Sequence, residues 1–137
     1  MGLFVLWSRN GRKSRFHVAF RIKSSIFAAT KKNCTVMNKV RITAIRQTVY
    51  PDLMARFENP IEHTCDVVEG QQWISIDGKC PEGMCPAAWY SMREFVESLA
   101  RGEGNFYDGW MKNPMSAMIN CNDGFRPFSF YNEVINE

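Results

Sequence analysis

The sequence predicts an α+β domain in which a small, mostly antiparallel sheet carries one long helix on one face. Three observations lead to this prediction: an amphipathic stretch over residues 86–101, shorter stretches in which apolar and polar residues alternate, and a hairpin pattern near the C-terminus. The predicted order from residue 37 onward is β-α-β-α-β-β. With 137 residues, 45% of them hydrophobic, the chain can bury the core of one such domain.

The first strand and the first helix follow from two local patterns. The stretch KVRITAI, residues 39–45, alternates as a half-buried strand does. A short helix is predicted from Pro51, because proline is favoured at the first helical position and apolar residues recur at helical spacing over 53–57. Residues 59–70 lack either period and are predicted to be irregular.

The second strand and the long helix have clearer signals. Residues 71–76 form the strand, which ends at the turn dipeptide DG. Pro86 suits the first position of the long helix and Gly102 suits its end. One face of this helix is apolar and should meet the sheet; its members are Trp89, Met92, Phe95, Val96 and Leu99.

The final hairpin covers residues 116–131. A two-residue loop would place Pro127 where a strand N–H is required, so a four-residue NDGF loop is preferred, with Cys121 and Arg126 as its closing pair. One face of the hairpin then meets the helix; it contains Ala117, Ile119, Cys121, Arg126, Phe128 and Phe130. An arginine beside a thiol favours the reactive thiolate. The alternative is that Cys121 only fills space while Arg126 extends to solvent.

Cys85 is a second candidate for chemistry. With Pro86 at the first helical position, Cys85 falls at the N-cap, where unpaired N–H groups and the helix dipole stabilise a thiolate. The alternative is that this cysteine is a weak substitute for the usual capping residues.

A metal site is a further hypothesis. His63 and Cys65 are two residues apart and could ligate one ion from an extended segment, and Cys85 and Cys121 would complete a set for zinc or iron. The cysteine separations match no recognised metal signature, so scattered thiols are the alternative, and His63 alone would be a surface histidine.

The aromatic loop GEGNFYDGW, residues 102–110, has two interpretations. Phosphate binding is disfavoured, because the loop follows a helix instead of opening one and lacks the GxGxxG spacing. Its aromatic residues are expected to cover the sheet, and the alternative is a small-ligand pocket. The residues concerned are Asn105, Phe106, Tyr107, Asp108 and Trp110.

Charge divides the chain into two parts. Residues 1–36 carry eight Lys and Arg and no acidic residue, whereas residues 37–137 carry nine Lys and Arg against fourteen Asp and Glu. The predicted domain is therefore acidic and would repel nucleic acid, so only the leader could bind nucleic acid or an anionic membrane. The composition of the leader fits a start assigned upstream of a true start at Met37, and it also fits a mitochondrial presequence.

The cysteine count indicates the compartment. Five cysteines are an odd number, no secretory signal is recognised and no stretch is long enough to span a membrane. Reduced thiols and a cytoplasmic location are therefore expected.

Residues 37–137 resemble a family of short prokaryotic proteins of unassigned activity. The resemblance rests on NPIEHTCD, PEGMCPAAW, GNFYDGWMKNP and CNDGFRPFSF, which together span most of the predicted domain. It implies a small intracellular domain with Cys65, Cys85 and Cys121 inside the matching segments, whereas Cys34 and Cys80 lie outside them.

Two hypotheses of function follow. The first is a binding or accessory domain of unknown ligand, with a pocket between the long helix, the aromatic loop and the hairpin. The second is a metal or thiol redox site formed by Cys65, Cys85 and Cys121, with Arg126 as electrostatic support. The sequence leaves open whether the protein is an enzyme.

Overall fold

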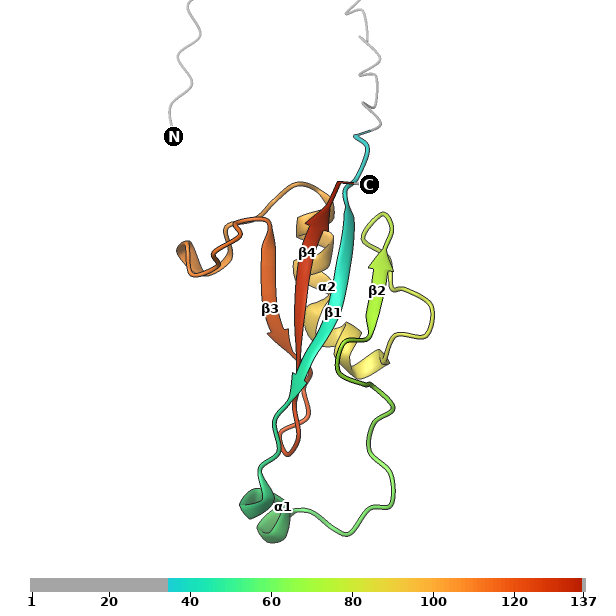
Figure 1. Cartoon of the computed structure of the whole chain (residues 1–137), viewed down its shortest axis with the longest axis vertical. Coiled ribbons are helices and arrows are strands. Elements are labelled where there is room, and N and C mark those ends of the chain that lie inside the picture. Colours follow the sequence, from blue (N-terminus) through green and yellow to red (C-terminus); the bar gives the residue numbers. More distant parts are fainter. Residues whose placement is uncertain (1–34, 137) are drawn as a thin grey trace, which may run out of the picture. The chain divides into compact units, whose positions relative to one another are not determined.

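Four antiparallel strands and two α-helices make up the part of the chain that the computed structural model describes, residues 35–136 (Figure 1). The elements are β1 (Lys39–Gln47), α1 (Pro51–Phe57), β2 (Gln72–Ser75), α2 (Pro86–Ala100), the 3-10 turn η1 (Phe106–Asp108), β3 (Ser116–Asn120) and β4 (Phe128–Ile135). The strands lie in the order β2-β1-β4-β3. The predicted α+β class and element order are confirmed, whereas the predictions for residues 1–34 fall outside the described part.

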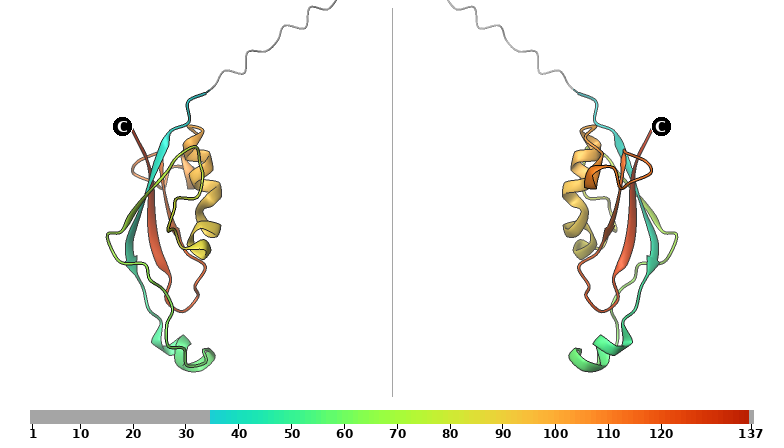
Figure 2. Two further views of the ribbon diagram at one scale, coloured as in Figure 1. Left: turned by 90° about the vertical axis from the view of Figure 1, so that its right-hand side faces the viewer. Right: turned by 90° about the vertical axis from the view of Figure 1, so that its left-hand side faces the viewer.

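Helix α2 covers one face of the sheet, as the edge-on views in Figure 2 show. Inward residues of β1 and β4 alternate with outward ones, and Met92, Val96 and Leu99 of α2 are fully buried against them. Full burial of a side chain of this kind contributes about 1.5–3 kcal/mol. The core contains Val40, Ile42, Ala44, Trp73, Met84, Ala88, Met92, Val96, Leu99, Ala100, Ala117, Ile119, Phe128 and Phe130.

Both ends of α2 are where the sequence signals place them. Pro86 is at the start, and the helix ends before Gly102, whose φ of +82° is in the left-handed region that glycine adopts without strain. The N–H groups of Gly102 and Glu103 donate to the carbonyl oxygens of Leu99 and Ser98 at 3.0 and 2.9 Å. These bonds satisfy carbonyl groups that the last turn leaves free.

The register of the hairpin differs from the prediction. Cys121 lies opposite Phe128, to whose carbonyl oxygen its N–H donates at 3.0 Å, so the predicted closing pair of Cys121 and Arg126 is wrong. The loop spans residues 122–127, because the side chain of Asp123 accepts hydrogen bonds from the N–H groups of Phe125 and Arg126 at 2.8 and 3.1 Å. The shift is two residues, so the predicted inward face is retained, with Ile119 and Phe128 buried.

Residues 48–71 form an arm that includes α1 and projects beyond the end of the sheet before it returns to β1, where Gly70 and Gln71 form hydrogen bonds with Ala44 (Figure 1). None of the seven residues of α1 is buried. The arm is attached to the hairpin loop by hydrogen bonds from the N–H groups of Thr48 and Tyr50 to the carbonyl oxygens of Pro127 and Phe125, at 3.0 and 2.8 Å. Its second half returns to β2 and supplies part of the candidate site.

Candidate functional site

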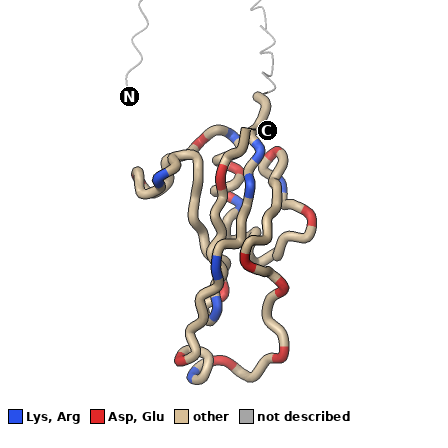
Figure 3. The backbone as a smooth tube through the Cα atoms, in the orientation of Figure 1, with Lys and Arg blue, Asp and Glu red and all other residues tan. Residues whose placement is uncertain are grey.

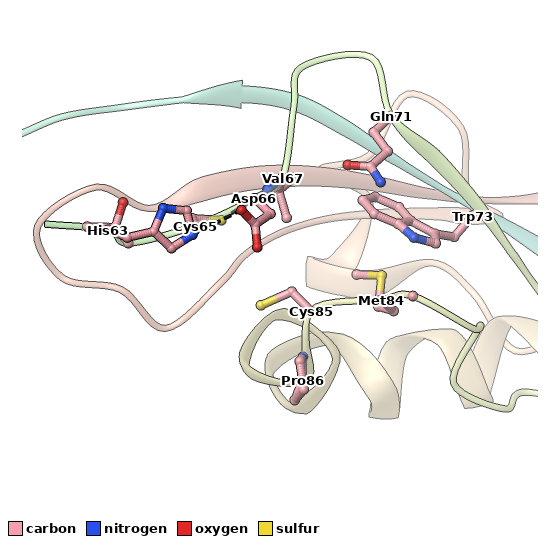
Figure 4. A pocket seen from close by; sticks show the side chains of 11 residues that line it. His63, Cys65, Asp66, Val67, Gln71, Trp73, Met84, Cys85 and Pro86 are labelled. Carbon is pink, nitrogen blue, oxygen red and sulfur yellow. Dashed lines mark hydrogen bonds and ion pairs between the residues drawn. The ribbon is translucent and has the colours of Figure 1, made fainter.

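A cavity of about 440 Å³ lies beside the start of α2. Three segments surround it: residues 63–67 of the arm, the start of β2 and residues 83–86 (Figure 4). A volume of this size suits a small molecule. Its wall includes His63, Cys65, Asp66, Trp73, Met84 and Cys85.

The inner wall of this cavity is apolar. Trp73 points inward from β2 and is only 8% exposed, and its ring lies 6.2 Å from that of Phe130. Met84 is also buried. The indole therefore has a fixed place in the core, so a ligand would meet a preformed surface there.

Cys85 lies where the cavity meets the helix. It is the N-cap of α2, with Pro86 next to it, so the predicted N-cap position is confirmed. No side chain caps the first turn by a hydrogen bond. The N–H groups and the dipole at this end of the helix therefore favour an electron-rich group in the cavity.

Cys65 approaches the cavity from the arm. It is half-buried, and its sulfur accepts a hydrogen bond from the N–H of Val67 at 3.4 Å. His63 and Asp66 lie at the exposed mouth, where the Nε2 of His63 is 2.9 Å from a carboxylate oxygen of Asp66. Both of these side chains are largely in solvent, so their ion pair adds little to stability.

The structure brings Cys65, Cys85 and His63 to one cavity, but Cys121 is not part of its wall. Cys121 directly follows the last residue of β3, and its sulfur accepts a hydrogen bond from the N–H of Phe128 at 3.3 Å. Within residues 35–136, no group of three or more His, Cys, Asp or Glu side chains is placed to hold a metal ion. The predicted zinc or iron set is therefore not assembled, because the hairpin ladder holds Cys121 elsewhere.

Arg126 has a different role from the predicted one. Its guanidinium binds the carboxylate of Glu58, with a longer contact of 3.5 Å from Nη1 to Asp123, and it is only 9% exposed. The hydrogen bond with Glu58 raises the pKa of Arg126. Arg126 therefore joins the arm to the hairpin and does not support Cys121. It also lines a second cavity of about 440 Å³, with Met54 and Ile61 among the other residues.

The aromatic loop packs on α2. The ring of Phe106 meets that of Phe95 edge-on at 5.1 Å, and Tyr107 lies 5.9 Å from the same ring. Trp110 stacks near Tyr107 but is 82% exposed, so the prediction that it covers the sheet is wrong. Asn105 and Asp108 are the polar residues of the small-ligand pocket considered for this loop, and their φ values are positive, at 59° and 53°. Neither of the two cavities described above has a residue of the aromatic loop in its wall.

Sequence reasoning missed several residues of the site, among them the two that form its apolar wall. Trp73 occupies an inward position of an alternating strand, and this pattern could have marked it as a wall residue. Met84 lies in irregular chain before α2, where no periodicity exists to indicate its direction.

Comparison of the chain with models of known protein families, with curated proteins and with solved structures gave no match. The resemblance drawn from the sequence motifs therefore stays a prediction. None of the helices in residues 35–136 has the length and apolar character needed to cross a membrane.

Proposed function

We propose that residues 35–136 form a small binding domain whose ligand occupies the cavity beside the start of α2. The observation that carries this proposal is the meeting of three separate segments around one cavity of about 440 Å³. Such sites commonly combine an apolar wall with a few polar groups that orient the ligand. Here Trp73 and Met84 supply the wall, and Cys65 and Cys85 supply the polar groups.

The chemistry of the cavity limits the ligand class. An aromatic or other flat apolar group fits against Trp73, and an electron-rich atom of the ligand can accept hydrogen bonds at the start of α2. This site is at the opposite end of α2 from the aromatic loop, where the sequence hypothesis placed its pocket. We propose the cytoplasm as its location, since the four described cysteines are free thiols.

The test uses a library of small neutral aromatic fragments, with the backbone amide signals of the protein followed by NMR. Binding should shift the amide signals of residues 63–67, 73 and 83–85. A fragment set that shifts only signals elsewhere would refute the proposed site.

A matched pair of variants sharpens this experiment. Thr64 is exposed and lies on the cavity wall, so Thr64→Phe should fill the cavity and weaken fragment binding at least tenfold. Thr48 is exposed and is not part of the wall, so Thr48→Phe adds the same bulk and should leave binding unchanged.

A second candidate function is thiol chemistry at the same cavity, because Cys65 and Cys85 both line it. In a thiol–disulfide exchange, the sulfur of Cys85 would attack a disulfide substrate and one substrate sulfur would leave as a thiolate. Residues 35–136 contain no group of three or more side chains placed to hold a metal ion, so this candidate rests on the thiols alone. The thiol candidate requires that Cys85 react faster than an ordinary surface thiol.

Alkylation with limiting iodoacetamide, followed by peptide mass spectrometry, tests this candidate. Desolvation raises the pKa of the Cys80 thiol, so the exposed Cys80 provides a slow internal reference. Cys85 should be labelled before Cys80 and Cys121. Equal or faster labelling of Cys80 would leave simple binding as the function of the cavity.

A further inference from the structure

The arm formed by residues 48–71 lacks the internal packing that normally keeps a short helix folded. Helix α1 has seven residues, none of them buried, and helices of this length are marginal in water without tertiary contacts. The known attachments lie at its flanks, through Tyr50 and through Glu58, which pairs with Arg126. The exposed side of α1 is therefore available to another surface.

That exposed side is apolar. Tyr50, Leu53 and Phe57 recur at intervals of three and four residues and form one stripe, with the guanidinium of Arg56 4.8 Å from the centre of the Phe57 ring. Ile61 lies in the extended chain beyond the end of the helix. Phe57 is 64% exposed and Ile61 is 52% exposed. An exposed apolar stripe of this kind on a projecting helix is typical of a surface that contacts another chain.

A second apolar surface lies on the face of the sheet opposite α2. Exposed side chains from three strands point outward there: Ile45 of β1, Ile74 of β2 and Met118 of β3. A β-bulge between Ala44 and Arg46 turns both Ile45 and Arg46 to this side. We call this surface the outer face.

The two surfaces have opposite charge, as Figure 3 shows along β1 and around the arm. The arm contains five acidic residues and one basic residue, Arg56; Glu58 is already paired with Arg126, so the other four acidic residues carry the negative charge of the arm. On the outer face, β1 presents Lys39, Arg41 and Arg46, and the strands offer one acidic side chain there, Glu133, which pairs with Arg41 at 2.7 Å. An acidic arm and a basic outer face are therefore electrostatically complementary.

We propose that the protein forms a two-fold dimer in which the arm of each copy docks on the outer face of the other. The stripe formed by Tyr50, Leu53 and Phe57, together with the exposed Ile61, covers the outer face, and the acidic residues of the arm lie near the basic residues of β1. Two identical contacts result, as two-fold symmetry requires. The partner is a second copy because one chain supplies both complementary surfaces.

The molar mass of the full chain in solution tests the dimer. Size-exclusion chromatography with light scattering should give twice the chain mass of 15.8 kDa at micromolar concentration. Phe57→Ser removes the aromatic contact at both of the identical interfaces, so it should raise the dimer dissociation constant on the order of 30-fold or more. The fold should be unaffected, because Phe57 is not buried within its own chain.

Two controls make the result specific. Tyr90 on α2 is 68% exposed, close to the exposure of Phe57, so Tyr90→Ser should leave the dissociation constant unchanged. Arg46→Glu should weaken the dimer, and the added change Glu62→Lys should restore part of the affinity by reversing the charge of the arm.

Three results would overturn the proposal. The first is a monomer at 100 µM or above, on the order of ten times the concentration at which such an interface should form. The second is a dimer that Tyr90→Ser weakens and Phe57→Ser does not. The third is a dimer that Arg46→Glu weakens and that the double variant, with Glu62→Lys added, forms more weakly still.

Discussion

Replacement of Cys85 by serine and by alanine separates the capping role of this residue from its sulfur chemistry. Cys85 is the N-cap of α2, and no side chain caps the first turn. Pro86 has no N–H, so the N–H groups of Ala87 and Ala88 are the ones that a capping side chain would serve. A serine hydroxyl accepts such a hydrogen bond well, whereas alanine cannot.

The contribution of a capping hydrogen bond is the difference in the free energy of unfolding between Cys85→Ser and Cys85→Ala. Both remove the sulfur and its packing, so their comparison isolates the hydroxyl group. An N-cap hydrogen bond contributes about 1 kcal/mol, so Cys85→Ser should be more stable than Cys85→Ala by about that free energy of unfolding. For a unit of about 100 residues, this corresponds to a difference in Tm of about 4–8 °C.

Urea denaturation followed by circular dichroism measures this difference. With a slope of about 2 kcal/mol per molar urea, the midpoints of the two variants should differ by about 0.5 M. Cys80 is exposed and outside any helix, so Cys80→Ser and Cys80→Ala should have matching midpoints. If Cys85→Ser is no more stable than Cys85→Ala, the assignment of residue 85 as a capping position is refuted.

Three further predictions concern the core and one tight loop. Gly104→Ala should lower the free energy of unfolding by about 1–3 kcal/mol, because the new methyl group would meet the carbonyl oxygen of Pro114. Gly124 has open space around it, so Gly124→Ala should change the free energy of unfolding by less than about 1 kcal/mol. Thermal unfolding measures both variants. Phe130→Ala should cost about 3–5 kcal/mol, because this ring is fully buried, and a loss below about 1 kcal/mol by urea unfolding would contradict the described core. Asn132→Leu should be neutral or stabilising by calorimetry, because Asn132 is fully buried, its Oδ1 has no hydrogen-bond partner and its Nδ2 donates one long bond of 3.4 Å to the carbonyl oxygen of Ala117. A loss above about 2 kcal/mol would show that the side-chain amide is well satisfied.

Much of the fold could be predicted because its signals are local. The period of the apolar residues over 86–100 specifies both that α2 is a helix and which face it buries. Alternation places Val40 and Ile42 on the inner face of β1 for the same reason. The N-cap position of Cys85 also follows from its immediate neighbour, Pro86.

The candidate site could be predicted only in part. Its cysteines were identified by type and local position, but their grouping depends on how the irregular segment 59–71 returns to the sheet. No periodicity in that segment specifies its path, so the sequence could not separate Cys121 from Cys65 and Cys85. The composition of the aromatic loop favoured a pocket there, whereas the cavity lies at the other end of α2.

Interactions between distant residues were decided by the tertiary structure alone. Arg126 pairs with Glu58, 68 positions earlier in the chain. The hairpin closes with Cys121 opposite Phe128, because the side chain of Asp123 and the chain that follows β1 form hydrogen bonds with the loop. By itself, the sequence determined which residues of α2 and of the strands face the core, since helical and strand periods are properties of neighbouring residues. Partners across the fold depend on chain path and register, and local patterns do not encode these.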